Sequence, residues 1–199
     1  MSDTGFVEVL FRLGNMAESR ELDNTAHLER IRRYCYLLAT TLGLPLRQVE
    51  QISNASLLHD IGKFSLPDTI IKKAGKYEQH EWEEVQKHTV VGASLLKNSS
   101  DQTLQLAEAI AMSHHERWDG SGYPSGLKME EIPLAARICA VADVYDALTT
   151  KRVYKKLVPP EEALALITES GGVLFDPNLA RKFGDVYSEI EKVRKMVSK

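Results

Sequence analysis

The chain has 199 residues, of which 43% are hydrophobic and 27% charged, and its formal net charge is −3. Such a composition is typical of a globular protein with one sizeable core. The charge excludes a broadly basic surface that would wrap a DNA or RNA duplex, and no apolar run approaches the roughly 20 residues that span a membrane. The first residues do not fit a signal peptide, and Cys35 and Cys139 fall in apolar helical patterns that favour free thiols, so we expect a cytoplasmic protein.

Apolar residues recur at three- and four-residue spacing along almost the whole chain, which is typical of amphipathic helices. No alternation of the kind that marks β-strands reaches a useful length. The expected helices cover about residues 6–16, 24–42, 45–58, 67–73, 81–96, 101–113, 133–148, 160–170 and 177–193. Asp101 and Asp176 are expected to cap the helices that follow them, and residues 119–124 form the clearest loop. We therefore predict an all-α fold, a single helical bundle of about seven to nine helices.

Residues 1–199 are expected to form a single domain. Within it, 1–19 would form an N-terminal helix, 20–156 would carry the metal and substrate site, and 157–199 would form the C-terminal helices. No receiver or sensor domain fits ahead of about residue 20, so a stand-alone enzyme and an excised domain are both open. The first helix could pack on its own domain or on a second copy, which leaves a homodimer open as well.

The pair His59-Asp60 offers an imidazole nitrogen and a carboxylate at one point in space, and both are good ligands for a divalent metal. Because apolar residues flank the pair, we expect it to emerge from a buried helix that ends at Gly62. Lys63 would then place an ammonium group beside the metals. A carboxylate that bridges two cations, with a lysine nearby, is suited to binding and cleaving a phosphate ester.

Five further residues could complete such a centre: His27, His88, His114, His115 and Asp143. Each alone fits an ordinary interpretation, such as a surface histidine or a buried carboxylate held by a hydrogen bond. Together they lie mostly at helix ends or on apolar helix faces. Two first-row metals that share Asp60 need about this many ligands while leaving positions for water. The sequence thus favours a two-metal hydrolytic centre.

The order of His27, His59-Asp60 and Asp143 resembles the HD superfamily of metal-dependent phosphohydrolases. The run His-His-Glu-Arg-Trp-Asp-Gly-Ser-Gly-Tyr-Pro, residues 114–124, resembles the second signature of the HD-GYP branch of that superfamily. The similarity extends from about residue 6 to the C-terminus. It implies hydrolysis of the bacterial second messenger cyclic di-GMP at a centre of two or three divalent metal ions, often iron or manganese.

The resemblance also implies roles for individual residues. The implied metal ligands are His27, His59, Asp60, His88, His114, His115 and Asp143. Lys63, Arg152 and Lys155 are implied to contact substrate phosphates. In the mechanism that we expect, a hydroxide held between two metals bridged by Asp60 attacks phosphorus, and Lys63 stabilises the charge on the phosphoryl oxygens. The products would be linear pGpG and, after a second cut, GMP.

Several points stay open at this stage. Asp23 stands four residues before His27, where three-metal members carry glutamate, so it could bind a third metal or serve as a helix-start carboxylate. Tyr123 could shape the substrate pocket. Alternatively, the loop Gly122-Tyr123-Pro124 could contact diguanylate cyclase (GGDEF) domains, as the resemblance suggests. Trp82, Trp118 and Tyr154 could stack on guanine or simply pack.

Two rival functions also stay open. One is an HD phosphohydrolase that acts on another cyclic dinucleotide or nucleotide. The other is a non-catalytic module that binds cyclic di-GMP or a partner domain. Turnover that a chelator abolishes would separate an enzyme from such a module.

Overall fold

The computed structural model describes residues 3–20, 24–73, 75–150 and 157–197. Over these residues the chain forms nine α-helices, three short 3-10 helices and no β-strand. The elements are α1 (Asp3–Ala17), α2 (Asn24–Thr41), α3 (Leu46–Ala55), η1 (Ser56–Leu58), η2 (Ile61–Ser65), α4 (Asp68–Ile71), α5 (Gln79–Leu96), α6 (Gln102–Ser113), η3 (Met129–Glu131), α7 (Leu134–Thr149), α8 (Pro160–Glu169) and α9 (Pro177–Val197). The prediction of an all-α bundle is confirmed, and none of the described helices is long and apolar enough to cross a membrane.

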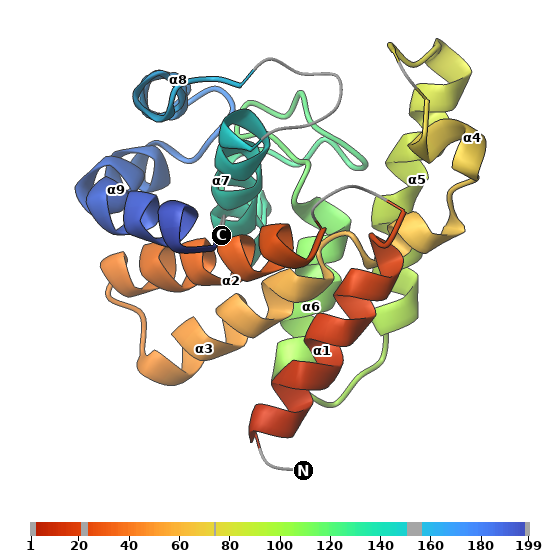
Figure 1. The fold of residues 1–199 in the computed structure, drawn as a ribbon, viewed down its shortest axis with the longest axis horizontal. Coiled ribbons are helices and arrows are strands. Elements are labelled where there is room, and N and C mark those ends of the chain that lie inside the picture. Colours follow the sequence, from red (N-terminus) through yellow and green to blue (C-terminus); the bar gives the residue numbers. More distant parts are fainter. Residues whose placement is uncertain (1–2, 21–23, 74, 151–156, 198–199) are drawn as a thin grey trace.

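Helix α2 is the centre of the bundle and packs against α3, α7 and α9. Figure 1 shows it crossing the middle of the molecule, with α9 on one side and α5 on the other. Ile31 and Leu38 of α2 are fully buried, as are Ile138 of α7 and Phe183 of α9. Burial of such side chains is the main stabilising contribution to a bundle of this kind. The core therefore fixes the start of α2 against α7, and His27 and Asp143 lie on these two helices.

The expected helix caps at Asp101 and Asp176 are confirmed. Asp101 Oδ1 accepts hydrogen bonds from the backbone amides of Thr103 (2.8 Å) and Leu104 (3.0 Å). Asp176 Oδ1 accepts one from the amide of Asn178 (2.8 Å). Such caps satisfy amides at a helix start that otherwise lack a partner.

The segment around His59-Asp60 departs from the prediction of one helix ending at Gly62. Helix α3 ends at Ala55, and the chain continues through η1 and η2, with Gly62 inside η2. A Cβ atom on Gly62 would lie 1.9 Å from the carbonyl oxygen of His88. Gly62 is therefore needed because the backbone of η2 packs directly on α5, and not because it stops a helix.

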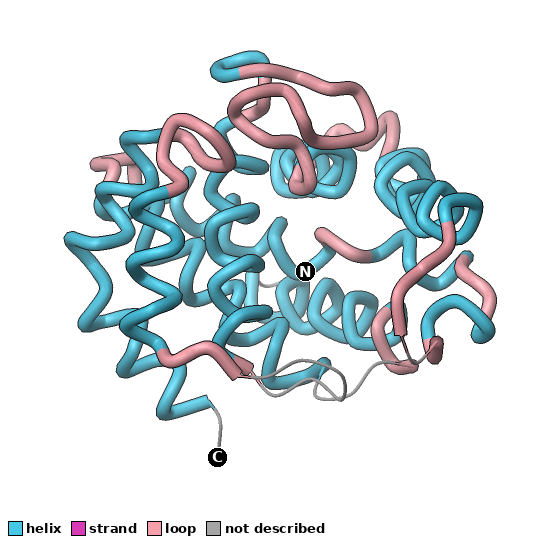
Figure 2. The backbone as a smooth tube through the Cα atoms, turned by 90° about the horizontal axis from the view of Figure 1, so that it is seen from above, coloured by secondary structure: helices cyan, strands magenta, loops and turns pink. Residues whose placement is uncertain are grey.

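The longest described loop, residues 114–133, joins α6 to α7 and is interrupted only by η3. In Figure 1 part of it runs between α7 and α5, and in Figure 2 it belongs to the pink segments along the upper edge. The fold thus brings the end of α6, α5 and the η1–η2 segment together beneath this loop.

Cys35 and Cys139 are buried free thiols, as expected.

Candidate metal centre

Four predicted donors form one compact cluster, here called the first donor group: Asp60, His88, His114 and His115. Each offers one ligand atom, and these atoms all lie within 4.8 Å of one another. Asp60 lies between η1 and η2, His88 lies in α5, and the two adjacent histidines directly follow α6. His114 and His115 reach the same site because the helix ends at Ser113.

Hydrogen bonds to the backbone orient the histidines of the site. The Nδ1 atoms of His59, His88 and His114 lie 2.9, 2.6 and 3.0 Å from the carbonyl oxygens of Ser56, Val85 and Ile110. An imidazole whose Nδ1–H donates to a carbonyl carries its lone pair on Nε2. All three rings therefore present Nε2 as the ligand atom.

These ligand atoms are buried and lack protein partners. Nε2 of His59, His88 and His114, and Oδ1 of Asp60, have no hydrogen-bond partner among the described residues. The His88 and His114 Nε2 atoms approach Asp60 Oδ1 at 3.1 and 3.5 Å without the geometry of a hydrogen bond. Buried polar atoms without partners are costly, and a divalent cation satisfies this set of nitrogen and oxygen donors. The residues fit the metal centre that the sequence predicts.

A second donor group consists of Glu18, His27 and His59, whose ligand atoms also lie within 4.8 Å of one another. Asp143 lies beside it, with Oδ1 3.9 Å from His27 Nε2. Of these four residues, Glu18 is the one that was not predicted as a ligand from the sequence. It stands nine residues before His27, directly after α1, at no spacing that would mark it as a ligand.

Asp60 connects the two groups. Its Oδ2 atom lies 3.3 Å from His59 Nε2 and 2.7 Å from Lys63 Nζ. The Lys63 side chain is 18% exposed, so its ammonium group lies at the rim of the centre. Asp60 therefore lies between the two donor groups, with Lys63 beside it, and its bridging of two metals stays a prediction.

The pKa values of His114 and His115 are set mainly by burial. Burial lowers the pKa of His114. Burial and the neighbouring His114 hold the pKa of His115 well below its usual range. Both imidazoles are therefore neutral at pH 7, which is the form that ligates a metal.

In the second donor group, neighbouring charges outweigh burial in setting the pKa of His59. Burial opposes the charged form of His59, but the charges of Asp60 and Glu18 outweigh it and raise the pKa of His59 to about 10. Burial also raises the pKa of Glu18. For Asp60, Lys63 and His59 outweigh burial and hold the pKa well below its usual value. A cation that binds here must displace a proton from His59.

Three of the predicted site residues lie outside the described residues: Asp23, Arg152 and Lys155. Their expected roles, a third-metal ligand for Asp23 and phosphate contacts for Arg152 and Lys155, stay predictions. His80, the one histidine outside the predicted site, is 77% exposed at its side chain.

The loop Gly122-Tyr123-Pro124 folds back onto His115 of the first donor group. The Tyr123 ring stacks on the His115 ring at 4.8 Å between centroids, and its amide donates to the His115 carbonyl oxygen (3.2 Å). A Cβ atom on Gly122 would lie 2.4 Å from the Arg117 amide nitrogen, so only glycine permits this close return. Tyr123 therefore covers a donor, whereas Pro124 is exposed.

Aromatic side chains continue from Tyr123 to the surface. The Trp82 ring meets the Tyr123 ring edge-on at 5.6 Å, and Tyr77 stacks on Trp82 at 6.3 Å. Trp82 and Tyr77 are 39% and 38% exposed. A row of rings thus leads from the first donor group to solvent.

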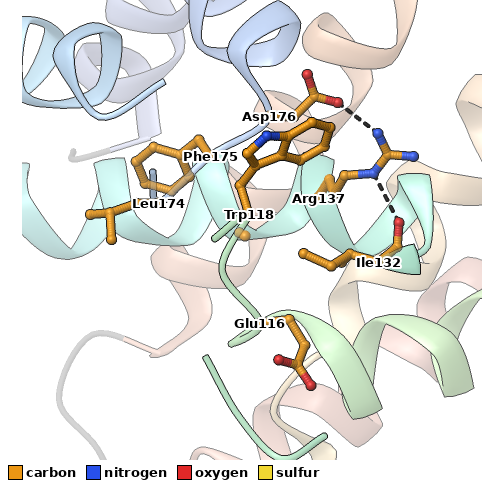
Figure 3. Close-up of a pocket in the computed structure, with 8 residues that line it drawn as sticks. Glu116, Trp118, Ile132, Arg137, Leu174, Phe175 and Asp176 are labelled. Atoms are coloured by element: carbon orange, nitrogen blue, oxygen red, sulfur yellow. Dashed lines mark hydrogen bonds and ion pairs between the residues drawn. The ribbon is translucent and has the colours of Figure 1, made fainter. Parts of the chain in front are cut away.

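Trp118 anchors the start of the loop on the far side of the donors. Its amide donates to the Leu174 carbonyl oxygen (3.1 Å), and its ring lies under the guanidinium of Arg137 at 5.6 Å. Figure 3 shows Arg137 reaching Asp176 and the carbonyl of Ile132 beside this ring, around a small pocket. The contacts of Trp118 hold the loop in place, and none of the donors lines the pocket.

Comparisons with known proteins agree with this geometry. A family model described as HD domain matches residues 12–179. A cyclic di-GMP phosphodiesterase of Thermotoga maritima is 41% identical over 186 residues, which cover 94% of this chain and 50% of that protein. The 3'3'-cGAMP-specific phosphodiesterase 2 of Vibrio cholerae is 40% identical over 187 residues, 94% of this chain and 36% of that protein. The chain thus spans half or less of the length of these curated relatives.

Solved structures show the same fold at lower sequence identity. A cyclic GMP-AMP specific phosphodiesterase of Vibrio cholerae has a TM-score of 0.70 and 20% identity, covering 97% of this chain and 51% of that chain. An HD-GYP-type protein from Bdellovibrio bacteriovorus has a TM-score of 0.65, also at 20% identity, covering 83% of this chain and 54% of that chain. At such identities the likeness shows the fold alone.

Proposed function

This chain belongs to the HD domain family, and on that premise we propose that it is a metal-dependent phosphodiesterase. The proposed substrate is cyclic di-GMP, and the products are linear pGpG and, after a second cut, GMP. The names of relatives at about 40% identity support the substrate class. The HD-GYP resemblance of residues 114–124 points to the same substrate class.

One observation carries the proposal: the buried ligand atoms around Asp60 have no hydrogen-bond partners among the described residues. A structural cluster of histidines would satisfy these atoms with protein partners. We therefore assign the first donor group and the second donor group to two divalent cations, iron or manganese, with Asp60 between them. Asp143 beside His27 adds a further carboxylate to the second position.

The cations, when bound, would acidify water and stabilise negative charge on phosphoryl oxygens. The protein's own residues would hold the phosphates and bases of the substrate beside the cations. Asp60 holds the Lys63 ammonium at 2.7 Å, from where Lys63 can neutralise charge that develops on a phosphate at the rim. Arg152 and Lys155 are proposed to hold the substrate phosphates, Arg152 through two hydrogen bonds and Lys155 as a point charge. Tyr123 and Trp82 offer ring faces and edges for a purine base.

Overall the reaction is a hydrolysis. Water adds to phosphorus, the bond from phosphorus to the 3'-oxygen breaks, and that oxygen gains a proton. Two such steps convert one cyclic dinucleotide into two mononucleotides. Neither step requires an oxidant or a second substrate.

A second candidate substrate is 3'3'-cGAMP, because a relative of equal similarity is named as specific for it. The two substrates differ in one base, so the choice depends on base contacts and not on the cations. The ratio of kcat/KM for cyclic di-GMP and 3'3'-cGAMP decides between them.

The test of the proposal uses protein purified without oxygen, with its metal content measured. Cyclic di-GMP is incubated with wild type and with Asp60→Ala, with and without a chelator, and products are separated by chromatography. We expect pGpG or GMP from wild type, loss of turnover with chelator, recovery with iron or manganese, and an inactive variant. Binding of cyclic di-GMP without chelator-sensitive turnover would instead favour a non-catalytic module.

Further proposals concern partners and compartment. The exposed Pro124 supports contact of the Gly122-Tyr123-Pro124 loop with a diguanylate cyclase domain. The partly exposed apolar side chains of α1, Val9 and Met16 among them, support a homodimer. The free thiols of Cys35 and Cys139 support a cytoplasmic location.

A further inference from the structure

We propose that Glu18 is a direct ligand of the cation held by His27 and His59. The inference rests on the proposed pair of cations and adds to it a residue that neither the sequence pattern nor the family resemblance identified. It gives the second position a carboxylate from the end of α1.

The environment of Glu18 favours a ligand over an ordinary buried carboxylate. Glu18 is 3% exposed, and its Oε1 atom has no hydrogen-bond partner among the described residues. Oε2 lies 3.8 Å from His27 Nε2, beyond a normal hydrogen bond. Burying a carboxylate oxygen without a hydrogen-bond partner is expensive, and a cation held by Glu18, His27 and His59 would compensate this cost.

The position of Glu18 is set by the backbone and not by a single side-chain torsion. Glu18 continues the hydrogen bonding of α1 by one residue, with its amide donating to the Gly14 carbonyl oxygen (3.1 Å). A Cβ atom on Gly14 would lie 2.3 Å from the Leu57 carbonyl oxygen, so α1 packs tightly on η1. Leu57 is two residues before His59, and the same contact therefore fixes Glu18 relative to His59.

The facing histidines direct their ligand atoms toward Glu18. His27 Nδ1 is bound to Asp146 (2.7 Å), and His59 Nδ1 faces the Ser56 carbonyl oxygen (2.9 Å). Their Nε2 atoms are thus the ones that share a space with the Glu18 carboxylate, within 4.8 Å of one another. Donors on a common first-row metal, each about 2.1 Å from it, lie up to about 4.2 Å apart, so a small adjustment completes the site.

Charge supports the same assignment. Two divalent cations bring four positive charges, and Asp60 and Asp143 together supply two negative charges. Lys63 adds a positive charge beside Asp60. A third carboxylate at Glu18 brings the site closer to neutrality, which favours binding of the second cation in a buried position.

The alternative role is structural, in which Glu18 only positions His27. The two roles predict different effects of removing the charge while keeping the shape. A structural carboxylate changes the stability of the protein with or without metal. A ligand changes the cation affinity and the stabilisation that the cation confers.

The experiment titrates the metal-free 199-residue chain with Mn²⁺, in wild type, Glu18→Gln and Glu18→Asp. Calorimetry gives stoichiometry and affinity, and thermal unfolding with and without Mn²⁺ gives the Tm increment. Glu191→Gln is the matched control, because Glu191 is a buried carboxylate bound to Tyr145 and Arg194 instead of the donors.

We expect two Mn²⁺ ions per wild-type chain. Glu18→Gln should keep one site at wild-type affinity and weaken the other by about ten-fold or more. Its metal-free Tm should match or exceed that of wild type, whereas its Mn²⁺-dependent increment should fall. Glu18→Asp should bind the second ion with intermediate affinity, and Glu191→Gln should bind both ions as wild type does.

Two Mn²⁺ ions bound with wild-type affinity by Glu18→Gln would overturn the proposal, as would a wild-type chain that binds only one. A variant that loses stability equally with and without Mn²⁺ would also overturn it. None of these measurements uses substrate. Failure of the phosphodiesterase activity and failure of the Glu18 assignment are therefore observed separately.

Discussion

His27 Nδ1 lies 2.7 Å from Asp146 Oδ2, although 119 residues separate them in the chain. Asp146 is 1% exposed and is also held by Arg30, whose Nε atom donates to its Oδ1 at 2.6 Å. The Asp146 carboxylate lowers the cost of burying the Arg30 charge. The pair fixes the His27 ring so that Nε2 points to the second donor group.

Asp146→Asn should therefore weaken Mn²⁺ binding at the second position by about 10- to 100-fold. It should also destabilise the fold by about 3 kcal/mol, because the Arg30 charge stays buried with a weaker partner. Calorimetric titration and urea unfolding measure the two effects. Asp176→Asn, which weakens a comparable arginine pair at Arg137, should cost stability but leave Mn²⁺ affinity unchanged. Equal Mn²⁺ affinity of Asp146→Asn and wild type would contradict the role given to the pair.

Gly62→Ala should be strongly disruptive. The new Cβ atom would lie 1.9 Å from the His88 carbonyl oxygen and 2.6 Å from the Gly92 amide nitrogen, so η2 must move away from α5. We expect a loss of about 2–3 kcal/mol and of most activity, because the move separates Asp60 from His88. Gly184→Ala in α9 is the control. Its Cβ atom would meet nothing closer than 3.9 Å, so we expect a gain of up to about 1 kcal/mol. A Gly62→Ala protein with wild-type unfolding and turnover would contradict the close packing.

Lys63→Gln should lower kcat by about 100-fold while the metal content stays intact, because the charge that faces the phosphate is lost. Steady-state kinetics with metal analysis on the same samples separates the two properties. Lys73→Gln removes a lysine of a similar ion pair with Glu81 and should leave kcat unchanged. If Lys63→Gln loses metal and activity together, Lys63 serves the metal centre and not the phosphate.

Trp82→Ala should raise KM for cyclic di-GMP by about ten-fold with little change in kcat, since stacking on one base contributes about 1–3 kcal/mol. Initial rates over a range of substrate concentrations measure both constants. Tyr36 in α2 is similarly exposed, at 38%, and Tyr36→Ala serves as the control. An unchanged KM would show that the ring row only packs the loop against α5.

A carboxylate remote from the donors makes stability depend on pH. Burial disfavours the charged form of Glu191, but Arg194 and Tyr145 outweigh it and lower its pKa. Because the folded pKa lies below the unfolded value of about 4.3, its stabilising contribution is present above that pH. It is lost as the pH falls through the lowered folded value. Glu191→Gln should therefore be about 1 kcal/mol less stable at pH 7. This difference should disappear in acid, as measured by urea unfolding between pH 3 and 7.

Residue type and helix periodicity were enough to predict the all-α fold and to select donors that the structure brings together. His59, Asp60, His88, His114 and His115 could be found because histidines and an aspartate at predicted helix ends or on apolar faces are unusual in their own local patterns. No distant contact was needed to notice them. His27 and Asp143 could be predicted as ligands only in combination with these residues.

Glu18 and the Asp146–Arg30 pair could not be found in this way. The burial of Glu18 depends on the packing of α1 against η1, and the contact of Asp146 with Arg30 spans 116 residues. Neither contact leaves a periodic trace in the sequence. The prediction that Gly62 stops a helix was wrong for a related reason, because the close approach of the His88 carbonyl oxygen is invisible in the local pattern.

The unpartnered nitrogen and oxygen atoms around Asp60 have a consequence for the life of the protein in the cell. Without metal, folding removes these atoms from water and gives them no partner. The free energy of unfolding therefore depends on the concentration of metal ions. Under iron or manganese starvation we expect proteases to remove the chain faster, so that its abundance would fall together with the proposed turnover of cyclic di-GMP.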